Sequence, residues 1–194
     1  MNLRMNFSKK ISFFLILFSS FALFCFSGEN YSLEEALKVL RAIERIKTES
    51  ASENKTTLRK IAITESELNS YIAYRIEIEK EEVTKEIRLK LLEKNEIEGK
   101  IVIDLRNQEI PKFLKSLMNF YFAGKLEVEG GKIRLNIKKL FLENQPVHPM
   151  VLDLIIYISA KIEKTEASSI NDWYELPYGI DNIETHPGWV TIFY

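Results

Sequence analysis

The segment Pro149–Ile162 (PMVLDLIIYISAKI) is the sequence feature that most constrains how this chain can fold. Between Met150 and Ile158, Asp153 is the only charged residue. Proline is tolerated at the first position of a helix, so Pro149 predicts that a helix begins there. A helix with so few polar side chains must be covered by apolar material on most of its sides. The sequence leaves two kinds of cover open, the protein's own core and a bound lipid tail.

The segments before this helix predict an amphipathic antiparallel sheet that can cover it. Over residues 83–105, apolar residues alternate with charged ones on either side of a turn at 93–96, as in two strands that each bury one face. A second alternating pair occupies residues 120–137, and Gly130-Gly131 supplies the positive φ of its tight turn. Gly124 falls on the inward face of this pair, where it predicts a bulge or a close approach to the backbone.

Three further helices are predicted from caps and apolar spacing. Ser32 with Glu35, and Thr64 with Glu67, match the capping box, in which each side chain bonds the other residue's backbone N–H. Pro111 begins the third helix. The apolar residues expected to face the core recur every three or four positions. They are Leu33, Leu37, Leu40, Ile43 and Ile46 in the first helix, Leu68, Tyr71 and Ile72 in the second, and Ile110, Phe113, Leu114, Leu117 and Met118 in the third.

These elements predict the α+β class, with an antiparallel sheet of about five or six strands and helices packed on one face. A short strand is expected at 61–63, and two more are expected in the tail, at 176–180 and 188–193, with a turn at 186–188. The polar residues 48–60 are expected to form a linker. The predicted organisation is a leader at 1–27, an amphipathic helix and linker at 28–60, and a single domain at 61–194.

Residues 1–27 have the layout of a secretory signal peptide: a basic start, an uncharged apolar run and a small residue, Ser27, at the exit. An uncleaved anchor over residues 11–28 is the alternative, since that run is just long enough to span a bilayer. Either way the body is expected outside the cytoplasm, in the periplasm or secreted. Cleavage at Ser27 would remove the only cysteine, Cys25, so no disulfide is expected. A lipid-modified Cys25 is disfavoured because Phe24 precedes it.

The charge balance limits the partners. The chain has 27 basic and 28 acidic residues, a formal net charge of −1, and loss of Arg4, Lys9 and Lys10 with the leader would lower the charge by a further three units. No nucleic-acid partner is expected, because nucleic acid requires a basic face. The sequence also has no polybasic segment of the kind that binds anionic membranes.

No catalytic or metal-binding pattern stands out, so a non-enzymatic protein without a cofactor or metal is expected. His148 and His186 are each followed by proline, which places them in turns, and neither has a Cys, His or carboxylate at metal-ligand spacing. The paired glutamates at 34–35, 65–67 and 81–82 are expected to form caps and to complement helix dipoles.

The remaining side chains with functional potential are one carboxylate and a group of aromatic rings. Asp153 lies in the first turn of the apolar helix, where stabilisation by the helix dipole is expected and a contact with a ligand head group or a metal is the alternative. The aromatic residues gather towards the C-terminus, where strand packing is favoured over a pocket mouth or a membrane contact. They are Trp173, Tyr174, Tyr178, Trp189 and Tyr194.

Three short segments carry a family resemblance: Ile63–Asn69, Leu142–Met150, and Leu176–Ile180 with Gly188-Trp-Val. The first resembles the opening strand and threonine-capped helix of the bacterial extracytoplasmic proteins called YpmS-like and LmeA-like. The second is similar to their entry into an apolar helix, with His148 in place of a proline, and the third to their closing strands. The resemblance covers residues 61–194 and implies a curved half-barrel sheet of the tubular-lipid-binding type, wrapped on a long helix and able to hold acyl chains. It carries over no catalytic residues.

The leading functional hypothesis is a non-enzymatic protein of the cell envelope that binds a lipid or other apolar ligand between the sheet and the two helices that begin with proline. Burial of an acyl chain would contribute about 0.8 kcal/mol per methylene. The groove is expected to be lined by Phe113, Leu117, Phe120, Phe122, Leu152, Ile155 and Ile156. No other predicted element covers the apolar helix near Leu152 and Ile156. The rival hypothesis is a structural or protein-interaction component with a closed core, whose Ser32–Lys47 helix docks on an envelope protein partner.

Overall fold

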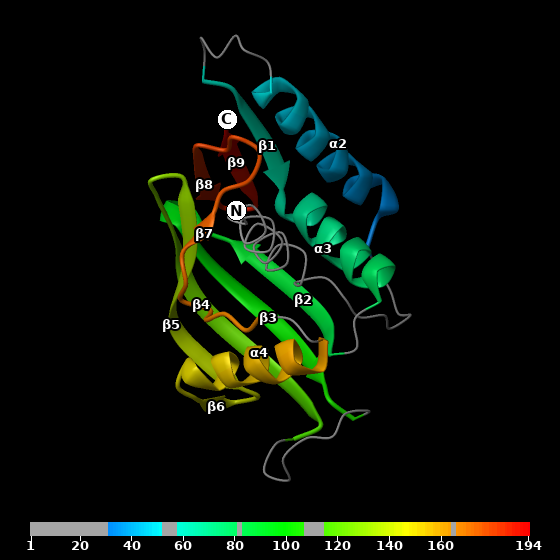
Figure 1. Ribbon diagram of the computed structural model, residues 1–194, viewed down its shortest axis with the longest axis vertical. Coiled ribbons are helices and arrows are strands. Elements are labelled where there is room, and N and C mark those ends of the chain that lie inside the picture. The colour runs from blue at the N-terminus through cyan, green and yellow to red at the C-terminus, as the bar shows by residue number, and fades with distance from the viewer. Residues whose placement is uncertain (1–30, 52–57, 81–82, 107–114, 164–165) are drawn as a thin grey trace, which may run out of the picture.

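The largest element of the fold is a six-stranded antiparallel sheet. The structure is a computed structural model that describes residues 31–51, 58–80, 83–106, 115–163 and 166–194. Four strands are ordered β2-β3-β4-β5, and two short strands, β6 and β7, pair with the two ends of β5 (Figure 1). The bounds are β2 Thr84–Leu91, β3 Glu96–Asp104, β4 Leu117–Glu129, β5 Lys132–Leu142, β6 Gln145–Pro146 and β7 Tyr174–Glu175. The predicted α+β class is confirmed, and so are the two hairpins.

Cross-strand rows of apolar residues form the inner face of this sheet. One row joins four strands through the pairs Ile87–Ile101, Ile101–Phe120 and Phe120–Leu142. Phe120 lies in the middle of this row and is fully buried. Side chains alternate across a strand, so the residues between these positions face the other side of the sheet. The period-two pattern of the sequence therefore predicted the buried face correctly.

Two glycines allow neighbouring strands to approach each other closely. A Cβ atom at Gly99 would lie 2.4 Å from the ring of Phe122, which packs over it from β4. A Cβ atom at Gly124 would lie 2.8 Å from the carbonyl oxygen of Asn136, and the register of β4 against β5 shifts between Ala123 and Gly124. The prediction of a bulge or close approach at Gly124 is confirmed, since both occur there.

A separate three-stranded antiparallel sheet, ordered β1-β9-β8, contains the start and the end of the predicted domain. Its strands are β1 Lys60–Thr64, β8 Asn182–His186 and β9 Trp189–Phe193. The tail turns between β8 and β9 at Pro187 and Gly188, as predicted. The strand predicted at 176–180 is wrong, because the positive φ angles of Tyr178 and Gly179 make a turn there and β8 begins later.

Three helices occur in the described part of the chain: α2 Leu33–Ser50, α3 Glu65–Glu79 and α4 Met150–Glu163. α2 packs along α3, and α3 packs against β2 beside the small sheet (Figure 1). α4 lies across the other end of the large sheet, near β6 (Figure 1). Buried residues of all three helices and of both sheets belong to one apolar cluster. The predicted N-terminal helix therefore shares a core with the rest of the chain.

The last residues of the helix predicted to begin at Pro111 are not helical. Residues 107–114, which contain its first turn, lie outside the described residues. Leu117 and Met118, expected on its last turn, instead begin β4, where Met118 pairs with Ile103 of β3. A short apolar run is ambiguous between helix and strand, and here pairing with an existing strand prevails.

The linker predicted at 48–60 is shorter than expected. α2 continues to Ser50, so its first residues are helical. Residues 52–57 lie outside the part that the structure describes. Beyond them, Arg59 already pairs with Tyr194 through two backbone hydrogen bonds of 2.9 and 3.0 Å. The predicted linker is therefore bounded by α2 on one side and by the pairing of Arg59 with Tyr194 on the other.

Asparagine side chains take the place of a strand at two sheet edges. The amide of Asn69, on α3, donates to the carbonyl of Leu89 and accepts from its N–H, both at 2.8 Å. Asn95, in the short 3₁₀ turn Glu93–Asn95, donates to the carbonyl of Ile183 at 3.3 Å and accepts from the N–H of Thr185 at 2.8 Å. Exposed strand edges favour association with other chains, so these contacts protect β2 and β8 from it.

The close packing of Phe122 over Gly99 gives a test of the sheet. We expect Gly99→Ala to lower the free energy of unfolding by about 1–3 kcal/mol, because the added methyl group overpacks the inner face. Urea denaturation monitored by circular dichroism measures the change. Gly130→Asn is the control, since it lies in the open turn, nothing is within 4 Å of its Cβ position, and asparagine tolerates its φ of +57°. Equal stability of Gly99→Ala and the wild type would contradict the close contact.

Candidate functional site

Most of the residues expected to line a lipid groove form the protein's core. Phe120, Phe122, Leu152 and Ile155 are between 0 and 4 % exposed and belong to the same apolar cluster. Ile156 is partly buried and packs against that cluster. These side chains from β4 and α4 therefore contact protein on nearly all sides.

The two other residues expected in the groove do not join this set. Leu117 is 44 % exposed, whereas its neighbour Met118 is 1 % exposed. Because successive side chains of a strand point to opposite faces, Leu117 lies on the face opposite Met118 and Phe120. Phe113 lies outside the described residues.

α4 has an apolar stripe that no described element covers. Met150, Leu154 and Tyr157 are 67, 38 and 46 % exposed, and their spacing of four and three positions places them along one side of the helix. We call these three residues the α4 stripe. The ammonium group of Lys161 lies 4.6 Å from the centroid of the Tyr157 ring, at one end of the stripe. The uncovered side of the helix is therefore this stripe. The expectation that it lies near Leu152 and Ile156 is wrong, because Leu152 is buried and Ile156 packs against the core.

Asp153 connects α4 to the chain that follows it. Its Oδ1 accepts hydrogen bonds from the Ser169 hydroxyl at 3.1 Å and from the Ile170 N–H at 2.8 Å. Ile170 is itself buried in the core. The carboxylate thus fixes the segment that follows the helix. These two hydrogen bonds account for its position without the helix dipole or a ligand head group.

The side of α2 that is buried overlaps the predicted one only in part, since Ile46 is buried and Leu40 and Ile43 pack against the core as expected. Its buried residues are Ala36, Val39, Ala42 and Ile46, whereas Leu33 and Leu37 are 53 and 40 % exposed. Small alanine side chains let α2 come close to α3. Counting only the large apolar residues missed this, and the alanines at 36 and 42 were the available signal.

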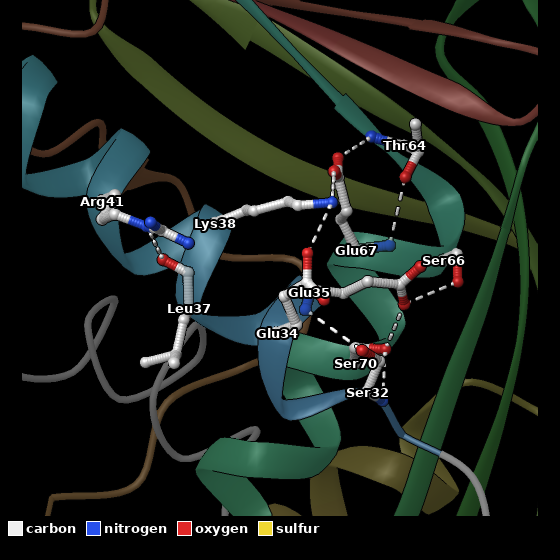
Figure 2. A network of polar contacts seen from close by, with 10 residues as sticks. All are labelled: Ser32, Glu34, Glu35, Leu37, Lys38, Arg41, Thr64, Ser66, Glu67 and Ser70. Atoms are coloured by element: carbon white, nitrogen blue, oxygen red, sulfur yellow. Dashed lines mark hydrogen bonds and ion pairs between the residues drawn. The ribbon is translucent and has the colours of Figure 1, made fainter.

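A polar network joins the first turn of α2 to α3 (Figure 2). Figure 2 shows the carboxylate of Glu35 accepting hydrogen bonds from the hydroxyls of Ser66 and Ser70, both at 2.8 Å. The N–H of Ser32 donates to the Ser70 hydroxyl at 3.2 Å. The hydroxyl of Ser70, and then that of Ser66, holds the pKa of Glu35 below its usual value. Ser32 accepts from the Glu35 N–H as predicted, but the Glu35 side chain points to α3 and does not complete a capping box.

A second carboxylate fastens the other end of α2. Glu49 accepts hydrogen bonds from Arg45 at 2.8 Å, from Arg59 at 2.7 Å and from the Tyr194 hydroxyl at 3.0 Å. These donors, Arg45 first, lower the pKa of Glu49 to about 2. Because Arg59 adjoins β1 and Tyr194 follows β9, this cluster joins α2 to the small sheet.

The remaining paired glutamates that the structure describes also serve the fold. Thr64 and Glu67 form the predicted capping box of α3, with both reciprocal hydrogen bonds present. Glu65 does not act as a cap, because its carboxylate accepts the N–H of Leu91 at the edge of β2, at 2.7 Å. The pair at 81–82 lies outside the described residues.

One buried carboxylate was missed by the sequence analysis. Asp104, at the end of β3, is 7 % exposed and forms an ion pair with Arg106, whose Nη2 lies 2.6 Å from its Oδ2. Hydrogen bonding to the Arg106 side chain lowers the pKa of Asp104. The Nζ of Lys85 is 3.9 Å from the same oxygen. An ionised, paired carboxylate of this kind is suited to structure rather than to proton transfer.

The two histidines have local structural contacts. The Nδ1 of His148 accepts a hydrogen bond from the Met150 N–H at 3.2 Å, at the start of α4. The ring of His186 stacks on that of Trp189, with centroids 4.0 Å apart. Within the described residues there is no group of three or more His, Cys, Asp or Glu side chains that could hold a metal ion. None of the described helices is long and apolar enough to cross a membrane.

The C-terminal aromatic residues are each engaged by another side chain. Each contacts a different neighbour: Trp173 lies under Arg134, Tyr174 bonds Ser168, Tyr178 faces Lys47, Trp189 stacks on His186, and Tyr194 bonds Glu49. The interpretation as packing residues therefore accounts for them better than a shared pocket mouth does.

Comparisons with protein-family models, with curated proteins and with solved structures found no match to this chain. The resemblance to the YpmS-like and LmeA-like proteins therefore stays a prediction. Functional inference depends on the surfaces and contacts described above.

The two carboxylates that fasten α2 predict an acid-sensitive helix. Their pKa values in the folded state are lower than the usual 4.5, so their stabilising effect is present above about pH 4.5 and is lost as the pH falls towards 2. We expect the hydrogen-exchange protection of α2 amides to fall over this range. Glu49→Gln should flatten the change, whereas Glu34→Gln, whose exposed side chain contacts Lys38, should not. Constant protection of α2 from pH 5 to 2 would contradict the role of both carboxylates.

Proposed function

We propose that this protein is a non-enzymatic component of the cell envelope that acts outside the cytoplasm through surface contacts. The signal-peptide pattern of residues 1–27 supports the location. The use of His148, Asp104 and the paired glutamates in structural contacts supports a protein without catalytic machinery. Of the two hypotheses from the sequence, this is the closed-core one.

The observation that carries the proposal is the burial of the residues expected to line a ligand groove. Phe120 and Phe122 of β4 pack with Leu152 and Ile155 of α4 in one cluster. Burying such a side chain stabilises the fold by about 1.5–3 kcal/mol, and protein interiors are close-packed. A lipid tail between the sheet and α4 would have to replace these contacts. The burial of these four side chains therefore supports a core that the chain fills with its own residues.

The solvent-exposed face of α2 is the surface that we assign to a protein partner. Leu33 and Leu37 are exposed there beside the charged residues Glu34, Lys38 and Arg41. An apolar centre with a rim of both charge signs is typical of a protein–protein contact, in which the rim charges select the partner. α2 is held at its first turn by α3 and at its last turn by residues beside the small sheet, so this face is presented in a fixed orientation.

Native mass spectrometry of the protein purified in mild detergent tests the closed core. We expect the mass of the polypeptide alone, because the interior is filled by side chains. One lipid retained per chain would contradict the proposal.

Cell fractionation tests the location, and recovery of the protein in the cytoplasm would contradict an envelope role.

A variant in the core distinguishes packing of the closed core from binding of a ligand. We expect Ile155→Ala to lower the free energy of unfolding of the lipid-free protein by about 2–5 kcal/mol, because it leaves a cavity between α4 and the sheet. Leu154→Ala is the matched control, since it removes the exposed neighbour on the same helix and should cost much less. Thermal and urea unfolding measure both. Ile155→Ala with unchanged stability but altered lipid uptake would instead favour an internal ligand site.

A further inference from the structure

The α4 stripe differs in charge from the exposed face of α2. Leu33 and Leu37 have both acidic and basic neighbours, as described above. Beside the α4 stripe, the charged contact is with the ammonium group of Lys161. Among the described side chains of α4, the only carboxylate is that of Asp153, and it bonds Ser169 and Ile170. The stripe is therefore apolar, and the charged group described in contact with it is the Lys161 ammonium.

This composition suits a lipid surface better than a protein surface. A helix that lies in the membrane interface presents an apolar face to the acyl chains and polar groups to the headgroups. Tyr157 has an apolar ring with a polar tip, and Lys161 has an apolar stem with a charged end, so both can extend across that boundary. The positive charge complements the phosphate groups of anionic lipids.

The placement of α4 also allows such a contact. Its inner side, with Leu152 and Ile155, is held in the core, so the outer side can meet a flat surface without unfolding the helix. Asp153 restrains the chain that follows the helix, which keeps this segment on the protein. An envelope location, which the leader predicts, would bring the protein close to a membrane.

We propose that the α4 stripe docks reversibly on the surface of a membrane that contains anionic phospholipid. This proposal rests on the extracytoplasmic location in the proposed function, but not on the closed core. The chain has no polybasic segment, so burial of Met150, Leu154 and Tyr157 supplies most of the attraction and Lys161 adds to it. The contact is weak because it involves so few side chains, and the protein exchanges between membrane and solution.

A label placed on the α4 stripe reports on the membrane contact of α4 itself. Its signal does not depend on whether the N-terminal segment also binds the membrane. The full chain carries Cys25→Ser and Leu154→Cys, and the new thiol is labelled with a fluorophore that responds to polarity. Addition of phosphatidylglycerol vesicles should shift its emission to the blue. The same label at Leu33→Cys, on the exposed face of α2, is the matched control and should not respond.

Two further substitutions separate the apolar and charged contributions. Met150→Glu with Tyr157→Glu should raise the lipid concentration for half-maximal response by at least tenfold. Lys161→Glu should raise it about fivefold with phosphatidylglycerol, because each basic residue near an anionic surface adds a small attraction. Both variants change exposed positions, and an unaltered melting temperature will show that they fold.

The result that overturns the proposal is a label at position 154 that stays silent at saturating phosphatidylglycerol, or one that responds no more than the label at position 33. A response to higher protein concentration without vesicles would assign the stripe to self-association and would also overturn it. Neither result bears on the closed core, which the lipid-free mass and the Ile155→Ala variant test separately.

Discussion

Burial of the inner face of the six-stranded sheet is the interaction on which the other elements depend. Phe120 lies in the middle of this face, and the row from Ile87 to Leu142 places apolar side chains from four strands on one surface. The outer face of the same strands carries ion pairs such as Lys100–Glu86. A sheet with one apolar face is stable only when something covers that face. α4 lies across part of it and α3 packs along the edge strand β2, and buried residues of both helices belong to its apolar cluster (Figure 1).

The polar residues near the start of the domain serve this architecture. In the segment Ile63–Asn69, Thr64 and Glu67 cap α3, while Glu65 and Asn69 bond the free edge of β2. A helix side chain thus satisfies backbone groups that another strand would otherwise satisfy.

The two sides of α4 connect the fold to the proposed function. The sequence shows a helix that is apolar nearly all round, and from this alone either a lipid or the core can be its cover. In the structure Leu152 and Ile155 lie in the core, while the α4 stripe stays in water. The sequence identified the helix as apolar because large apolar side chains are easy to recognise, but it assigned the ligand contact to Leu152, Ile155 and Ile156 and not to the α4 stripe. Which of them are buried could not be found, because this depends on the rotation of the helix against a sheet formed by distant segments.

Local patterns in the sequence determined most of the elements themselves. Period-two alternation specified the strands around Phe120, the pair Gly130-Gly131 specified their turn, and Thr64 specified the start of α3, because each of these signals involves residues only a few positions apart. Only the tertiary structure decided what the side chains contact. Glu35 has the spacing of a capping residue but bonds α3, and Met118 has helical spacing but pairs with a neighbouring strand. The physical reason is that contacts between distant segments are selected by the packing of the whole chain, and local propensity yields when the two disagree.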